Sequence, residues 1–104
     1  MEKHLSNITT IIETYNDLSA PDAVSVSGLL KELSSELFYL EKHRADYFNK
    51  HAAIMFEEQT SAAKAKIKAD HEVPEIYLLR RIMNAAYRVC DSMRSTISSL
   101  NKEK

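Results

Sequence analysis

Residues that break regular structure are scarce in this chain of 104 residues. It has one glycine, two prolines and no tryptophan, whereas average usage is about 7% glycine and about 5% proline. The chain can therefore form few turns, and we expect a small number of long helices. The length is that of a single domain, residues 1–104, with a thin hydrophobic core.

Cysteine and long apolar segments are equally scarce. The single cysteine, Cys90, has no disulfide partner within the chain and lies on an apolar helical face, so we expect a buried thiol in a reducing compartment. No apolar run approaches the roughly 18 residues of a membrane span, and the first seven residues lack the apolar core of a signal peptide. We therefore expect a soluble protein of the cytoplasm that does not bind membranes.

The residue patterns of enzymes and metal proteins are also missing. Gly28 is the only glycine, so no glycine-rich phosphate loop can form. No two of the four histidines are four residues apart, and none follows a glutamate by three, which argues against zinc and di-iron sites. A Cys–His nucleophilic pair would need Cys90 to be exposed. We expect a protein that is not an enzyme and carries no cofactor or metal.

An unbroken apolar seam is the clearest pattern that the sequence contains. Its members follow one another at alternating steps of three and four residues, which keeps one stripe of a helix facing a partner helix. The seam consists of Ile76, Leu79, Met83, Ala86, Cys90, Met93, Ile97 and Leu100. It predicts a helix over about 74–101, with Pro74 suited to its first position.

Two further helices precede this one. The first is predicted over about 3–18 and is broken at Ser19–Asp22, which contains Pro21. The second extends to about residue 69, and its start near residue 25 is open: Pro21–Asp22 could begin it, or Ser25 or Ser27 could cap it. Its apolar stripe is dense up to Leu40. It then resumes, shifted by one position, as Ala45, Phe48, Ala52, Met55, Gln59 and Ala62.

These elements predict an all-α fold: a short N-terminal helix packed on a long, coiled-coil-like antiparallel hairpin with its turn at about 69–74. A helix of 16 residues is about 24 Å long and covers less than half of such a hairpin. On this arrangement the first helix cannot reach the beginning of the last helix.

Apolar residues widen one flank of the seam in the last helix, at Leu78, Ile82, Ala85 and Val89. Exposed apolar surface of this extent usually marks an interface. The flank predicts self-association, most simply a two-fold dimer, although a bent hairpin with exposed aliphatic residues would also accommodate it.

Basic residues and a tyrosine occupy the remaining surface of the last helix: Arg80, Arg81, Tyr87, Arg88 and Arg94. Residues 1–41, by contrast, carry seven acids against Lys3 and Lys31. The two charged regions could pair inside the fold, or the arginines could bind an acidic protein or the phosphates of nucleic acid. The sequence pI of about 6.4 is far from the value above about 9 that is typical of nucleic-acid modules.

The last third of the chain, from Tyr87 to Lys102, resembles the tails of small all-helical bacteriophage proteins encoded near recombination and replication genes. The shared features are a tyrosine, an apolar seam, and an arginine followed by Ile-Ser-x-Leu and lysines. Leu37–Glu41 and Ser61–Lys66 are similar to earlier parts of the same group. The resemblance implies a phage or prophage accessory protein that acts on DNA metabolism or on a host protein, in the host cytoplasm.

We therefore expect a non-enzymatic interaction protein that binds a host or phage protein, such as a DNA-processing or defence factor. One alternative is a nucleic-acid-binding accessory protein of phage recombination or replication. Another is a helical-hairpin partner or chaperone of a bacterial export system, although such hairpins usually carry a Trp-x-Gly turn and this chain has no tryptophan.

Overall fold

The computed structural model describes residues 2–57 and 61–102, and these residues form four helices. They are α1 (Glu2–Asn16), α2 (Ala23–Glu57), α3 (Ala62–Glu72) and α4 (Glu75–Lys102). The molecule is elongated, with extents of 62 × 25 × 18 Å. Its radius of gyration is 18.0 Å, against about 13 Å for a compact domain of this size. The predicted all-α class is confirmed.

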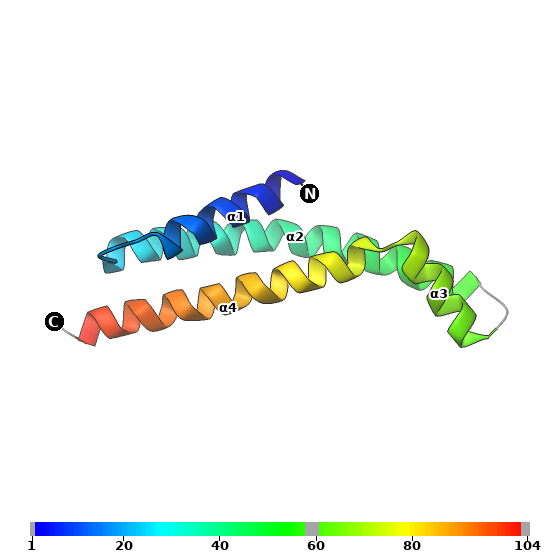
Figure 1. Ribbon diagram of the computed structural model, residues 1–104. Helices are drawn as coiled ribbons and strands as arrows, with labels where there is room; N and C mark the ends of the chain where they lie inside the picture. The colour runs from blue at the N-terminus through cyan, green and yellow to red at the C-terminus, as the bar shows by residue number, and fades with distance from the viewer. Residues whose placement is uncertain (1, 58–60, 103–104) are drawn as a thin grey trace.

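Helix α2 is the central helix of the fold, and the other three helices pack along it (Figure 1). Asp22 caps its start: the carboxylate accepts a hydrogen bond from the Ser25 backbone N–H at 2.9 Å. This contact satisfies one of the donors left free in a first helical turn and holds the pKa of Asp22 below its usual value. Of the starts left open by the sequence, Asp22 is the one used.

The position of the hairpin turn is a correction to the sequence analysis. The expected helix of about 25–69 is two helices, α2 and α3, and its residues 58–60 lie outside the described part of the chain. Ser61 caps α3 by accepting from the Lys64 backbone N–H, and α3 then packs back along α2. The chain therefore reverses direction between Glu57 and Ala62. Helices α3 and α4 form the returning arm of the hairpin, and the break at Val73–Pro74 lies within this arm (Figure 1).

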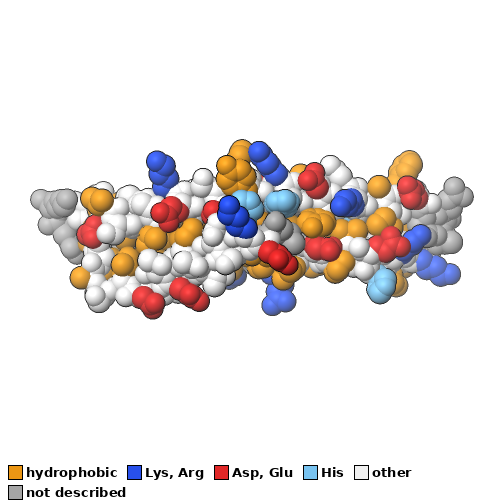
Figure 2. Space-filling view, turned by 90° about the horizontal axis from the view of Figure 1, so that it is seen from above, with side chains coloured by type: hydrophobic (Ala, Val, Ile, Leu, Met, Phe, Trp, Pro, Cys, Tyr) orange, Lys and Arg blue, Asp and Glu red, His pale blue; other side chains and the backbone are white. Residues whose placement is uncertain are grey.

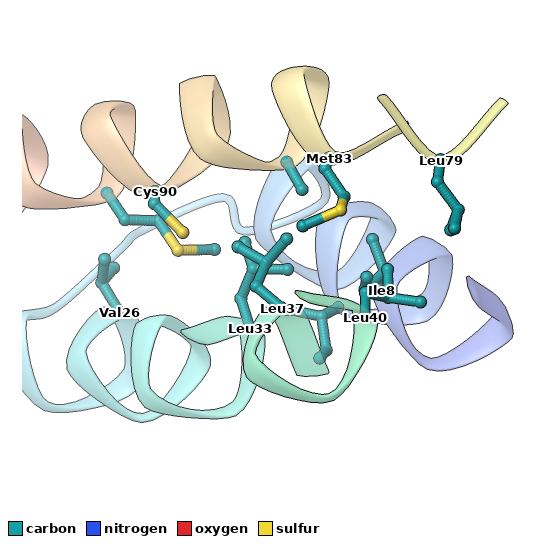
Figure 3. Packing of buried hydrophobic residues seen from close by; sticks show 11 residues of the cluster. Ile8, Val26, Leu33, Leu37, Leu40, Leu79, Met83 and Cys90 are labelled. Atoms are coloured by element: carbon teal, nitrogen blue, oxygen red, sulfur yellow. The ribbon is translucent and has the colours of Figure 1, made fainter. Parts of the chain in front are cut away.

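The core lies between α1, α2 and the seam of α4. Five of the eight seam residues are buried, and the other three are partly buried. In Figure 3, Met83 of α4, Leu37 and Leu40 of α2, and Ile8 of α1 point into one shared space. The predicted seam is thus confirmed as the face of α4 that packs inward.

The second half of α2 packs differently from the prediction. Tyr47, His51 and Ile54 are partly buried, as is Met55 of the expected stripe, whereas Ala45, Phe48 and Ala52 of that stripe are exposed. Beyond Leu40 the inward positions follow the 3.6-residue repeat of a straight helix. The expected stripe consisted mostly of other residues. Gln59, also part of that stripe, lies outside the described residues.

Candidate functional site

The outward surface of α4 is fixed by the inward seam. Because Leu79, Met83 and Ala86 face α2, the residues two positions further along the helix, Arg81, Ala85 and Arg88, turn away from the core. Cys90 is buried on the seam, and burial raises the pKa of its thiol. The expectation of a buried cysteine is confirmed.

The structure separates the five predicted partner-binding residues into two groups. Arg81 and Arg88 line one surface depression together with three residues of the apolar flank, Leu78, Ile82 and Ala85. We call these five residues the α4 surface. The sequence pattern predicts the arginines on one flank of α4 and the apolar residues on the other. In the structure, Arg81 and Arg88 lie near the centre of the outward face, next to both flanks.

Arg80, Tyr87 and Arg94 form the second group, because they repeat every seven residues on the other flank of α4. The Tyr87 hydroxyl donates a hydrogen bond to Glu41 of α2 at 2.9 Å, and Arg94 pairs with Asp91 at 3.0 Å. Burial and the bond to Glu41 both raise the pKa of Tyr87. Tyr87 and Arg94 are therefore already engaged within the chain.

The predicted self-association flank is shorter than expected. Leu78 is 48% exposed, Ala85 is exposed and Ile82 is half-buried, but Val89 packs against the core. Helix α1 contacts α4 through Tyr15, whose hydroxyl lies near Ser92 and Thr96 in the second half of α4. Because the chain reverses between Glu57 and Ala62, α4 pairs with the first half of α2, which is also where α1 lies.

The acidic and basic regions are not joined by ion pairs where the structure describes them. Among the described residues, no ion pair connects residues 1–41 with α4, and Arg81 and Arg88 make no ion pair or hydrogen bond. On the face that carries α1, acidic and basic side chains are interspersed with hydrophobic ones (Figure 2). Arg81 and Arg88 are thus exposed cations beside an apolar depression.

The histidines have partners that sequence spacing did not reveal. His4 Nδ1 of α1 lies 2.6 Å from Glu36 Oε2 of α2, and Asn7 donates to the other oxygen of that carboxylate at 3.1 Å. The His4 ring also stacks on Tyr39, with ring centroids 5.0 Å apart. These contacts fasten the start of α1 to α2. Only the tertiary fold brings these residues together, since they are about 30 positions apart.

A second polar cluster joins α2, α3 and α4. The Asp70 carboxylate lies 2.7 Å from His51 Nε2 and accepts hydrogen bonds from Lys66 Nζ at 2.8 Å and from the Tyr77 hydroxyl at 3.0 Å. Hydrogen bonds from these partners lower the pKa of Asp70 to about 2, and the bond from Lys66 has the largest effect. The Asp70 carboxylate in turn raises the pKa of Lys66. The cluster fixes the bend between α3 and α4.

The described ranges contain no cluster of metal-ligating side chains. No group of three or more His, Cys, Asp or Glu side chains within residues 2–57 and 61–102 is arranged to hold a metal ion. Over the same ranges, no helix combines the length and the apolar character that crossing a membrane requires.

Comparisons with known proteins do not assign the chain to a family. Neither family models nor curated proteins nor solved structures give a match to it. The α4 surface must therefore be interpreted from its own chemistry.

Proposed function

We propose that this chain is a non-enzymatic interaction protein that binds an acidic segment of another protein on the α4 surface. One observation carries the proposal: Arg81 and Arg88, without partners among the described residues, line the same depression as the exposed Leu78 and Ala85. An apolar patch bordered by two cations matches a partner helix with apolar residues on one face and carboxylates beside them.

A foreign partner fits this surface better than a second copy does. Two copies meeting through the α4 surface would bring two arginines from each chain into one interface, where like charges oppose association. An acidic partner would instead pair with both arginines while covering Leu78, Ile82 and Ala85. The self-association predicted for this flank becomes the less favourable alternative here.

The class of partner is suggested by the resemblance of Tyr87–Lys102 to small phage proteins. On that basis we propose a host or phage protein, such as a DNA-processing or defence factor, as the partner. Nucleic acid is the second candidate, because exposed arginines can also track phosphates. It is disfavoured by the formal net charge of −1. A role in export is the third, and the absence of tryptophan counts against it.

The proposal can be tested with two charge-matched double variants. Arg81→Glu/Arg88→Glu changes the α4 surface, whereas Arg80→Glu/Arg94→Glu makes the same change in net charge on the other flank. Proteins captured from a host lysate are quantified by mass spectrometry for each variant. The captured amount of a specific partner should fall by about tenfold or more only in the first variant. A tenfold loss of affinity corresponds to about 1.4 kcal/mol of binding free energy. Equal capture by both variants would contradict the proposal.

The nucleic-acid alternative requires a separate measurement. Binding of the wild-type chain to a fluorescent DNA duplex is followed by anisotropy at about 50 mM and about 200 mM salt. DNA binding through several arginines should weaken steeply between these conditions, because each neutralised phosphate releases counterions. Tight, salt-sensitive binding that Arg81→Glu/Arg88→Glu abolishes would replace the acidic protein with nucleic acid as the ligand.

A further inference from the structure

Helix α1 approaches the same flank of α4 that carries the apolar residues of the α4 surface. The Tyr15 hydroxyl of α1 lies 3.3 Å from Ser92 Oγ and 2.8 Å from Thr96 Oγ1. These two positions are two heptads beyond Leu78 and Ile82. Residues whole heptads apart share one side of a helix, so all four lie along one flank. This flank of α4 therefore already has a helix beside it over its second half.

The chemical character of the flank changes along α4. Its apolar residues are followed by residues with hydroxyl groups: Leu78, Ile82, Ala85 and Val89, then Ser92, Thr96 and Ser99. The hydroxyl groups lie where Tyr15 reaches α4 and bonds to them, whereas Leu78 is 48% exposed and Ala85 is also exposed. The first half of the flank thus has the composition of a helix-packing surface but is open to solvent at these two positions.

The spacing of the α4 surface matches a helix better than an extended segment. Leu78, Ile82 and Ala85 follow one another at steps of four and three residues, as in a seam between two helices. Arg81 and Arg88 are seven residues apart, which is about 10.5 Å along a helix axis. Residues seven apart in a second helix have the same separation and share a face. In an extended segment, a separation of about 10 Å takes three residues, whose side chains point to opposite faces.

We propose that the segment bound by the α4 surface is an α-helix that lies lengthwise along α4 and carries two acidic residues seven positions apart beside an apolar seam. The inference rests on the function proposed above and adds the conformation and the charge spacing of the partner. The partner's apolar residues would cover Leu78, Ile82 and Ala85. Its two carboxylates would pair with Arg81 and Arg88 through charge-assisted hydrogen bonds.

Three synthetic peptides of about 20 residues, long enough for a helix to form, test the inference. The first has leucine and alanine at alternating steps of three and four residues, with two glutamates seven positions apart beside them. The second has the same sequence with two central residues in the D-configuration, which disrupts a right-handed helix without changing composition or charge. The third has glutamine in place of both glutamates. Fluorescence anisotropy measures the binding of each labelled peptide to the full-length chain.

The first peptide should bind about tenfold or more tightly than either of the others. Equal binding of the first and second peptides would overturn the helical conformation and leave an acidic partner in place. Equal binding of the first and third would instead contradict the function proposed for the α4 surface, because the carboxylates would contribute nothing. If none of the three binds at about millimolar concentration, the inference is overturned, and capture from lysate still decides on the proposed function.

Two variants of the chain test where the first peptide binds. Leu78→Asp adds a negative charge within the α4 surface and should weaken binding by about tenfold or more. Ser99→Asp adds the same charge three heptads further along the same flank and should leave binding unchanged. Both positions are exposed, so both variants should keep the helicity of the wild type, which circular dichroism checks. Equal weakening in the two variants would show that the peptide does not lie along the α4 surface.

Discussion

The hydroxyl of Tyr15 lies 2.8 Å from that of Thr96, although the two residues are 81 positions apart. This contact joins the end of α1 to the last third of α4. Helix α1 therefore contacts both arms of the hairpin. This arrangement is possible because the returning arm begins near residue 61 and not near residue 74.

Replacing Tyr15 with Phe should therefore loosen α1. The substitution removes the hydroxyl that contacts both Thr96 and Ser92, and we expect a loss of about 0.5–1.5 kcal/mol in the free energy of unfolding. Urea denaturation followed by circular dichroism measures it. Tyr39→Phe is the matched control, because the Tyr39 ring stacks on His4. Equal losses in the two variants would show that the hydroxyl of Tyr15 contributes nothing specific.

Gly28 offers a stabilising substitution. It lies in α2, its φ is not positive, and a Cβ atom added to it would meet nothing within 4 Å. Gly28→Ala should raise the free energy of unfolding by about 0.5–1 kcal/mol, because alanine loses less conformational entropy in a helix. Thermal and urea denaturation check the sign, and destabilisation would mean that this position is crowded.

The Asp70 cluster predicts a defined acid sensitivity. The folded-state pKa of Asp70 is about 2 and its ordinary value is 3.8, so its stabilising contribution is present above about pH 4 and is lost as the pH falls toward 2. Asp70→Asn should lower the melting temperature at pH 7, and the difference from the wild type should shrink between pH 4 and pH 2. Asp17→Asn, at an exposed position, serves as the control. A difference that does not change with pH would contradict the account.

Cys90 should react slowly in the native protein. Burial excludes reagents from its sulfur and raises the pKa of the thiol, which lowers the fraction of reactive thiolate. Modification by Ellman's reagent at pH 8 should proceed far more slowly in the folded chain than in urea. Met83→Asp, which places a charge in the same seam, should unfold the chain and remove the difference.

The parts of the fold that could be predicted from sequence are those with a local cause. The seam from Ile76 to Leu100 has an unbroken period, and Pro74 marks a helix start by its own geometry. The reversal after Glu57 had no such signal, because no glycine or proline lies between Glu57 and Ala62. The cap provided by Ser61 was the available local signal, and a serine within a run of good helix formers is easily read as part of the helix.

The surfaces could be predicted only in part, because a pattern of apolar residues does not say which partner covers it. Ala45, Phe48 and Ala52 have the spacing of a core seam but lie on the outside. Arg81 and Arg88 were correctly singled out as exposed, but their position beside Leu78 and Ala85 depended on where α2 and α1 contact α4. The hydrogen bonds of His4 and His51 with Glu36 and Asp70 could not be predicted from the sequence for the same reason.

The central claim is that a foreign acidic segment occupies the α4 surface, and site-specific photo-crosslinking tests it most directly. A photoreactive benzoylphenylalanine is introduced at Ala85, between the two arginines, and in a second protein at Arg94 on the other flank. After irradiation in host lysate, crosslinked peptides are identified by mass spectrometry. The account predicts that position 85, and not position 94, captures one partner protein through a segment rich in Asp and Glu. Crosslinks from position 85 only to further copies of this chain, or equal capture from both positions, would contradict it.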